Sequence, residues 1–501
     1  MQYKNPIIKG FHPDPSICRV GEDYYLVTSS FEYFPGIPVF HSKDLVNWTQ
    51  IGNCAARAEE FPLEQVKDSG GIWAPTIRWN QGTFYVTATL EQYGNFIVSA
   101  QDPAGEWSSP VWVPVGGIDP SLLFDGDRVY YCTNQSLHPG REEITLEEID
   151  VRTGRLLGAQ KTIWSGVGGG FLEAPHVYHI GDWYYLLAAE GGTNFNHMIT
   201  VARSRSVDGS YESCPGNPVL TNLHDASRQV QCSGHGDLFQ DHLGNWWLVH
   251  LATRISRRTM SHLGRETFLT PVTWEEDWPV VGNNRKASLI CEGPLWAEQE
   301  AEKSWQADFS NRKWEPEWIF LRRPAEGAYE RGEGSLKLHP STVTFEAAKS
   351  PVFAAVRQCD FGCETEAVFD FEPRREGDEA GLAVVLASDF HYRFGKKRTQ
   401  EGNFLVVEKT AEDFRQTAFC APAPEGELRL CIRADKEFFT FCYASGEGEI
   451  HQVCKASTRF LSCELAGKCF TGTVIGLYAM SEVMTDAVME VKEFKMTPQP
   501  E

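Results

Sequence analysis

The chain has 501 residues, of which 42% are hydrophobic and 12% aromatic, and it carries a formal net charge of -22 at pH 7. Because a typical domain has ~150 residues, this length predicts two domains, with ample apolar material for their cores. The negative charge opposes long-range attraction to nucleic acid and to anionic membranes, and it suits either a neutral ligand such as a sugar or solubility alone.

The N-terminal segment, MQYKNPIIKGFHPDP, has no apolar core like that of a secretory signal. No run of residues approaches the ~18 apolar positions that a membrane-crossing helix needs. The 14 cysteines are scattered, and the close pair Cys359 and Cys363 has no partners at zinc spacing. We therefore expect a cytoplasmic protein with reduced thiols and no nucleic-acid or membrane partner.

One pattern recurs five times in the first 300 residues: a turn, an apolar strand, a polar turn and an aromatic strand. Each copy is typical of a β-hairpin, and five of them favour a five-bladed β-propeller over a sandwich with chance repetition. The copies start at Asp14-Pro15, Ala74-Pro75, Asp119-Pro120, Ala174-Pro175 and, more weakly, His235-Gly236, and end on Tyr24-Tyr25, Phe84-Tyr85, Tyr130-Tyr131, Tyr184-Tyr185 and Trp246-Trp247.

Three carboxyl groups stand at the entry to predicted inner strands. The first strand of a propeller blade lines the central channel, so Asp14, Asp119 and Glu173 are expected to meet at one mouth. Such carboxyl groups suit glycoside hydrolysis, which needs a protonated acid for the leaving oxygen and a second carboxylate for the sugar or for water. An Asp-Pro is more often a simple turn residue, whereas Glu173 lies in an apolar stretch where an isolated charge is costly.

After about residue 300 the repeat stops, and the charged segment 298–303 is interpreted as a linker. Apolar and polar residues then alternate in short runs, as in 381–386, 404–408 and 428–432, which is typical of an antiparallel β-sandwich. We therefore predict a catalytic propeller over residues 1–300 and a sandwich over 304–501. The sandwich has no catalytic cluster, so a structural or assembly role is favoured over carbohydrate binding.

Long motifs in the right order resemble glycoside hydrolase family 43, in its branch of β-xylosidases and α-L-arabinofuranosidases with a C-terminal, concanavalin-like jelly-roll sandwich. The resemblance covers essentially the whole chain. The motifs are FHPDPSI (11–17), SSFEYFPGIPVFHSKDLVNW (29–48), GGIWAP (70–75), GGIDPSLLFD (116–125), EAPHVY (173–178) and GRETFL (264–269).

The resemblance implies an all-β chain with a five-bladed propeller that inverts the anomeric carbon and requires no cofactor. It implies that Asp14 is the general base, that Asp119 raises the pKa of the acid and orients it, and that Glu173 is the general acid. Arg265 resembles the arginine that clamps the terminal sugar, with a surface salt bridge as the alternative. An inverting pair of carboxyl groups stands about 6.5–9.5 Å apart, and we expect this wider spacing for Asp14 and Glu173.

Further positions are expected near the substrate. In many family members the histidine at the position of His235 faces the channel and helps to hold a calcium ion through water, although a buried core histidine is nearly as good an explanation. Phe470 resembles a residue of a sandwich loop that closes the pocket. Sugars pack C–H groups on aromatic rings, and adjacent glycines allow close backbone approach. The expected substrate-binding residues are Phe31, Phe34, Trp73, Thr193, His235, Arg265 and Phe470.

The expected function is an exo-acting glycosidase that releases terminal β-1,4-xylosyl, and also α-L-arabinofuranosyl, units from short hemicellulose oligosaccharides. Thr76, where xylosidases often have His, and the run 234–237 depart from the usual pattern and leave the preferred sugar open. An α-L-arabinofuranosidase, an endo-arabinanase and a non-catalytic sugar-binding propeller are the alternatives. Relatives with this second domain tend to be dimers or tetramers, so a homo-oligomer is expected.

Overall fold

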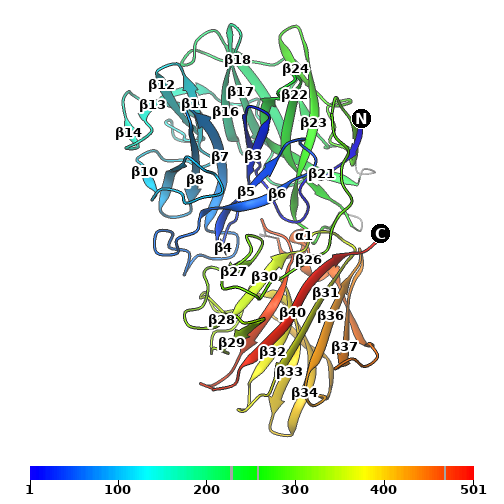
Figure 1. The fold of residues 1–501 in the computed structure, drawn as a ribbon. Coiled ribbons are helices and arrows are strands. Elements are labelled where there is room, and N and C mark those ends of the chain that lie inside the picture. Colours follow the sequence, from blue (N-terminus) through cyan, green and yellow to red (C-terminus); the bar gives the residue numbers. More distant parts are fainter. Residues whose placement is uncertain (226–228, 257–258, 468–469, 501) are drawn as a thin grey trace.

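The computed structural model describes residues 1–225, 229–256, 259–467 and 470–500. The chain forms a five-bladed propeller, drawn at the top of Figure 1, and a two-sheet sandwich below it. The all-β prediction of a propeller followed by a sandwich is therefore confirmed. No helix in the described ranges is long and apolar enough to cross a membrane.

Each blade is an antiparallel sheet that runs from the channel to the rim, and blades III and IV carry a fifth short strand. Blade I has β2 (Ser16–Val20), β3 (Asp23–Val27), β5 (Gly36–Ser42) and β6 (Thr49–Ala55). Blade II has β7 (Ile72–Asn80), β8 (Thr83–Leu90), β9 (Gly94–Ala100) and β10 (Val111–Val113). Blade III has β11 (Ser121–Asp125), β12 (Arg128–Thr133), β13 (Ile144–Asp150), β14 (Arg155–Leu156) and β15 (Lys161–Trp164).

Blades IV and V complete the ring. Blade IV has β16 (Glu173–Ile180), β17 (Trp183–Glu190), β18 (Met198–Ser204), β19 (Glu212–Ser213) and β20 (Leu220–Thr221). Blade V has β21 (Val230–Gln240), β22 (Trp246–Arg254), β23 (Arg265–Glu275) and β24 (Trp278–Val281). The N-terminal strand β1 (Gln2–Lys4) pairs with β25 (Ile290–Glu292), and Ile8 bridges to Thr267 of blade V, so the two ends of the propeller segment are held together.

The same backbone irregularity stands at the head of all five inner strands. Asp14, Ala74, Asp119, Ala174 and His235 have φ angles of 56°, 43°, 54°, 52° and 38°. A residue with a Cβ atom costs roughly 1–2 kcal/mol in this left-handed region. In β7, β16 and β21 the pairing register also shifts there, as in a β-bulge, which re-aims the neighbouring side chains. The repeat found in the sequence is therefore a repeated kink at the channel mouth.

The sandwich consists of two eight-stranded sheets. The first has β28 (Tyr329–Gly332), β29 (Ser335–Leu338), β40 (Met489–Pro498), β31 (Cys363–Phe371), β36 (Leu428–Ala434), β37 (Phe438–Ser445) and β38 (His451–Ser457), with β26 (Trp305–Gln306) beside β40. The second has β35 (Phe414–Pro422), β34 (Gly402–Ala411), β33 (Phe390–Thr399), β32 (Glu379–Ala387), β39 (Val474–Met480), β30 (Phe353–Arg357), β27 (Ile319–Leu321) and β4 (Tyr33–Phe34).

The propeller and the sandwich share structure where they meet. Strand β4 belongs to blade I in sequence, yet Phe34 pairs with Phe320 of β27 and extends the second sheet of the sandwich. Phe11 and Phe31 of the propeller lie in one buried apolar cluster with Phe353 of the sandwich. The short helices η1 (Thr458–Leu461) and α1 (Cys463–Ala466) precede β39, and α1 lies between the two domains (Figure 1).

Candidate active site

Three carboxyl groups from three blades meet at one mouth of the channel. Asp14 and Asp119 lie just before the inner strands β2 and β11, and Glu173 is the first residue of β16. The backbone N–H of Ala174 donates a hydrogen bond of 3.1 Å to Oδ2 of Asp119, which ties blade IV to blade III beside Glu173. Asp14 and Asp119 are buried, whereas Glu173 is partly exposed.

Asp14 is held as a carboxylate. Arg265 donates from Nη1 to its Oδ1 at 2.9 Å, and the Ser29 hydroxyl donates to its Oδ2 at 2.6 Å. Nδ1 of His235 lies 3.5 Å from the same Oδ1. Burial acts to raise the pKa of Asp14, but Arg265, His235 and the Ser29 hydrogen bond outweigh it, so the pKa is lowered. Asp14 is thus ionised at neutral pH and suited to act as a base.

Glu173 and Asp119 have the opposite tendency. Burial, then the negative charge of Asp14, raises the pKa of Glu173 to about 7, against an opposing effect of Arg265. Burial, then the charges of Glu173 and Asp14, raises the pKa of Asp119 well above its usual value. Carboxyl groups this close cannot all ionise, so a proton is retained in the site at neutral pH. One ionised and one protonated carboxyl group is the arrangement that acid–base hydrolysis of a glycoside needs.

Arg265 joins the propeller to the sandwich beside Asp14. Its Nη2 donates to the carbonyl oxygen of Phe470 at 3.1 Å, and its guanidinium carbon lies 5.6 Å from the ring centre of Phe31 and 5.5 Å from that of Phe470. The Phe470 N–H donates to Ser69 Oγ at 2.8 Å, which fixes the sandwich segment on blade II. Nε of Arg265 is buried and has no hydrogen-bond partner among the described residues, so it is free to donate to a bound hydroxyl.

The remaining residues expected to bind substrate differ in their exposure and in their contacts. Phe34 is 7% exposed and packs in the apolar core shared with the sandwich, and its contact with substrate stays a prediction. Trp73, at the head of β7, packs against the interdomain cluster and donates from Nε1 to the Ser69 carbonyl oxygen at 3.0 Å. Thr193 is partly exposed in the loop after β17.

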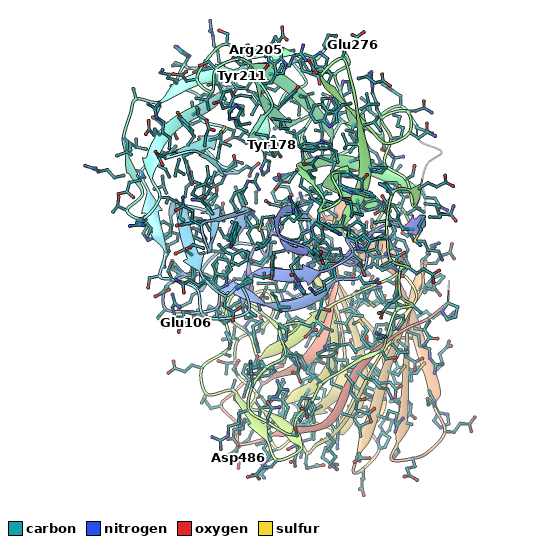
Figure 2. The ribbon with its side chains drawn as sticks, turned by 45° about the horizontal axis from the view of Figure 1, so that its top comes forward. Glu106, Tyr178, Arg205, Tyr211, Glu276 and Asp486 are labelled. Carbon is teal, nitrogen blue, oxygen red and sulfur yellow. The ribbon has the colours of Figure 1, made fainter. Side chains whose placement is uncertain are left out.

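Below the mouth, the channel is crossed by a charged network. Arg78 of β7 donates from Nη1 and Nη2 to the two oxygens of Asp237 on β21, at 2.7 and 3.1 Å. Asp237 also accepts from Ser16 Oγ and from the Tyr178 hydroxyl, both at 2.6 Å. Tyr178 lies toward the inside of the ring of blades in Figure 2, whereas Arg205 and Glu276 lie at its rim. The network bonds blades I, II, IV and V together across the channel.

These residues do not fit a calcium ion held by protein oxygens. Calcium takes six to eight oxygen ligands, and both oxygens of Asp237 already accept hydrogen bonds, with the Arg78 guanidinium beside them. His235 directs Nδ1 toward Asp14. Within the described ranges, no group of three or more His, Cys, Asp and Glu side chains is arranged to hold a metal. The water-mediated ion expected at His235 stays a prediction.

Removal of divalent metal ions is therefore expected to leave catalysis unchanged, because Arg78 already supplies the positive charge in the channel. The measurement is kcat/KM on an aryl pentoside before and after dialysis against excess EDTA. A loss of activity that added calcium restores would contradict this expectation.

Two departures from the usual family pattern have structural roles here. The Thr76 hydroxyl donates to the carbonyl oxygen of Pro120 at 2.9 Å and so ties blade II to blade III. A Cβ atom at Gly234 would lie 2.4 Å from the His197 ring, so only glycine fits beside that imidazole. Both residues thus shape the channel wall.

Several residues in the site or beside it are not predicted from the sequence. Ser29 is the first residue of the motif 29–48 and has no pattern that sets it apart within it, and Glu142 and Phe171 carry no spacing signal of their own. Glu142 accepts a hydrogen bond of 2.8 Å from the Phe171 N–H, and its charge contributes to the raised pKa of Glu173, after burial and Asp14. Their proximity results from the docking of a blade III loop on the approach to β16, which no local pattern encodes.

Comparison with known proteins agrees with this geometry. Residues 3–279 match "Glycosyl hydrolases family 43", and residues 306–497 match "Beta xylosidase C-terminal Concanavalin A-like domain". The chain belongs to glycoside hydrolase family 43. The family expected from the motifs is therefore confirmed, and this family 43 chain is a glycoside hydrolase.

Named relatives match this family 43 enzyme over nearly its full length. It is 41% identical over 491 residues to "Non-reducing end alpha-L-arabinofuranosidase BoGH43B" of Bacteroides ovatus, covering 95% of this chain and 91% of the relative. It is 35% identical to "Beta-xylosidase" of Bacillus subtilis, covering 95% and 96%. The solved structure "Bacteroides ovatus Xyloglucan PUL GH43B" superimposes with a TM-score of 0.95 at 38% identity, covering 100% of both chains.

Proposed function

We propose that this enzyme is an inverting exo-glycosidase that releases single terminal β-1,4-xylosyl or α-L-arabinofuranosyl units from short hemicellulose oligosaccharides. The observation that carries the proposal is the opposite pKa shift of two carboxyl groups at one mouth, lowered for Asp14 and raised to about 7 for Glu173. The similarity to relatives named as arabinofuranosidase and β-xylosidase supports the sugar class.

In the proposed mechanism, the Asp14 carboxylate removes a proton from a water molecule, and the water oxygen bonds to the anomeric carbon. The bond from that carbon to the glycosidic oxygen breaks on the opposite face, and Glu173 gives its proton to the departing oxygen. The anomeric configuration inverts. Asp14 ends protonated and Glu173 ionised, and exchange of both with solvent resets the site. Asp119, hydrogen-bonded to the Ala174 N–H, positions the backbone next to Glu173.

The contact of the sandwich with the site supports exo action. The segment at Phe470 comes from the sandwich, is bonded to Ser69 and Arg265, and places its ring 6.0 Å from that of Phe31. These contacts cover one side of the carboxyl groups, which favours a substrate that presents a chain end over a long polysaccharide that runs across the site. This coverage is the reason to prefer an exo enzyme to an endo-arabinanase.

A main activity on α-L-arabinofuranosides is the second candidate, and the 41% identity to the arabinofuranosidase of Bacteroides ovatus favours it. A screen of aryl β-D-xylosides against aryl α-L-arabinofuranosides, compared by kcat/KM, decides between the two. NMR of the first released anomer tests inversion, and retention of the anomeric configuration would contradict the proposed mechanism. Hydrolysis of neither aryl pentoside would instead favour a non-catalytic propeller. The expected homo-oligomer and cytoplasmic location stay predictions.

The pH profile of kcat/KM is expected to report the two carboxyl groups. Glu173 must keep its proton, so activity should fall as the pH rises through about 7. Asp14 must be ionised, and because its pKa is lowered, its protonation should reduce activity only at acid pH. In Glu142→Gln one negative neighbour of Glu173 becomes neutral while the acceptor for the Phe171 N–H is kept. The basic limb should then move to lower pH, and a basic limb that stays in place would contradict the assignment.

A further inference from the structure

Phe171 is a large aromatic residue left open to solvent beside the site. Its side chain is 62% exposed, and its backbone has a φ of 53°, in the left-handed region that disfavours a bulky residue. It lies two residues before Glu173, while the intervening Leu172 is buried. Scattered exposed apolar side chains are ordinary, so the position of Phe171 and what fixes it there decide its meaning.

The structure holds Phe171 from two sides. Its N–H donates to Oε1 of Glu142 at 2.8 Å, and the Gly191 N–H donates to the carbonyl oxygen of the preceding Gly170 at 2.7 Å. A Cβ atom on Gly192 would lie 3.2 Å from Cδ2 of Phe171, so the ring rests against that glycine. One part of the ring is thus supported by backbone, and the larger part remains available for contact.

The arrangement of blades places Phe171 on the leaving-group side. The groups that enclose the terminal sugar, Asp14, Arg265, Phe31 and Phe470, come from blades I and V and from the sandwich. Phe171 lies in the connection from blade III to blade IV, and in a ring of five blades that junction stands across the channel from blade I. Glu173 protonates the departing oxygen, so residues on its side of the mouth face the departing sugar.

We propose that Phe171 is the aromatic platform for the sugar residue on the leaving-group side of the scissile bond, and this inference rests on the glycosidase function proposed above. The ligand is a neutral pyranose unit whose C–H face packs on the open ring. Phe171 thereby determines preference for an oligosaccharide over a substrate with a minimal leaving group, and it takes no part in proton transfer.

The test compares a substrate with a sugar leaving group with one whose leaving group is a single atom. For a xylose-releasing enzyme these are xylotriose and β-D-xylopyranosyl fluoride. For an arabinose-releasing enzyme they are the trisaccharide arabinofuranosyl-substituted xylobiose and α-L-arabinofuranosyl fluoride. Phe171→Ala should raise KM for the trisaccharide about 3- to 10-fold. Its kcat/KM on the fluoride should stay unchanged, and Phe171→Trp should restore the trisaccharide KM.

A matched control is Phe414→Ala, because Phe414 is an exposed phenylalanine, 58% open to solvent, at the start of β35 in the sandwich. It should change neither substrate. An equal loss on both substrates in Phe171→Ala, or an unchanged trisaccharide KM, would overturn the platform. If the wild-type protein hydrolyses neither the trisaccharide nor the fluoride, the proposed glycosidase function fails instead.

Discussion

Replacement of Asp14 by alanine is expected to lower kcat/KM by about 10³- to 10⁴-fold on every substrate, whatever its leaving group. The nucleophile is water, and water attacks slowly unless a carboxylate removes its proton. Asp14 is the carboxyl group of the site whose pKa is held low, by Arg265, His235 and the Ser29 hydroxyl against the effect of burial. The measurement is kcat/KM on an aryl pentoside and on an oligosaccharide.

Alanine at this position also removes the partner of Arg265 and Ser29, so a second variant is needed. Asp14→Asn keeps a side-chain oxygen for Arg265 Nη1, which lies 2.9 Å from Oδ1 in the wild type, but it has no basic carboxylate. Equal losses in both variants, with KM little changed in Asp14→Asn, assign the loss to the missing base. Substantial turnover by Asp14→Asn would remove Asp14 from that role.

Replacement of Glu173 by alanine is expected to give losses that depend on the leaving group. On an oligosaccharide, whose departing oxygen needs a proton, kcat/KM should fall about 10²- to 10⁴-fold. A glycosyl fluoride or an activated aryl pentoside has a leaving group that departs without a proton from an acid. On these substrates the loss of kcat/KM should be much smaller. The raised pKa of Glu173, about 7, is what keeps this carboxyl group protonated at working pH.

Comparing the two variants distinguishes the base from the acid better than either variant does alone. Asp14→Ala should slow good and poor leaving groups alike, whereas Glu173→Ala should separate them. Glu173→Ala should also flatten the basic limb of the pH profile measured on the activated substrate. Equal losses on activated and unactivated substrates in Glu173→Ala would mean that another group donates the proton.

Two features of the site show where prediction from sequence stops. Phe34 stands in a motif next to the catalytic residues, but β4 leaves blade I and pairs with β27, so Phe34 packs in a core that is shared with the sandwich. Phe171 and Glu142 lie in loops without a motif, yet the Phe171 N–H donates to Glu142, and the charge of Glu142 acts on Glu173. Both outcomes depend on the docking of segments that are distant in sequence, which residue patterns do not specify.

The repeated units can be predicted from residue patterns alone. Each blade begins with a local hairpin whose turn and aromatic strand are formed by consecutive residues, so five copies predict five blades. The Asp-Pro and Glu-Ala-Pro runs predict that the carboxyl groups lie at the starts of strands. The ionisation of these carboxyl groups, in contrast, depends on contacts that form only in the folded chain. The pKa of Asp14 is lowered because Arg265 from blade V reaches it, and Arg265 is bonded in turn to Phe470 of the sandwich. Charges and burial act through space, and closing the ring of blades brings these groups within reach of one another.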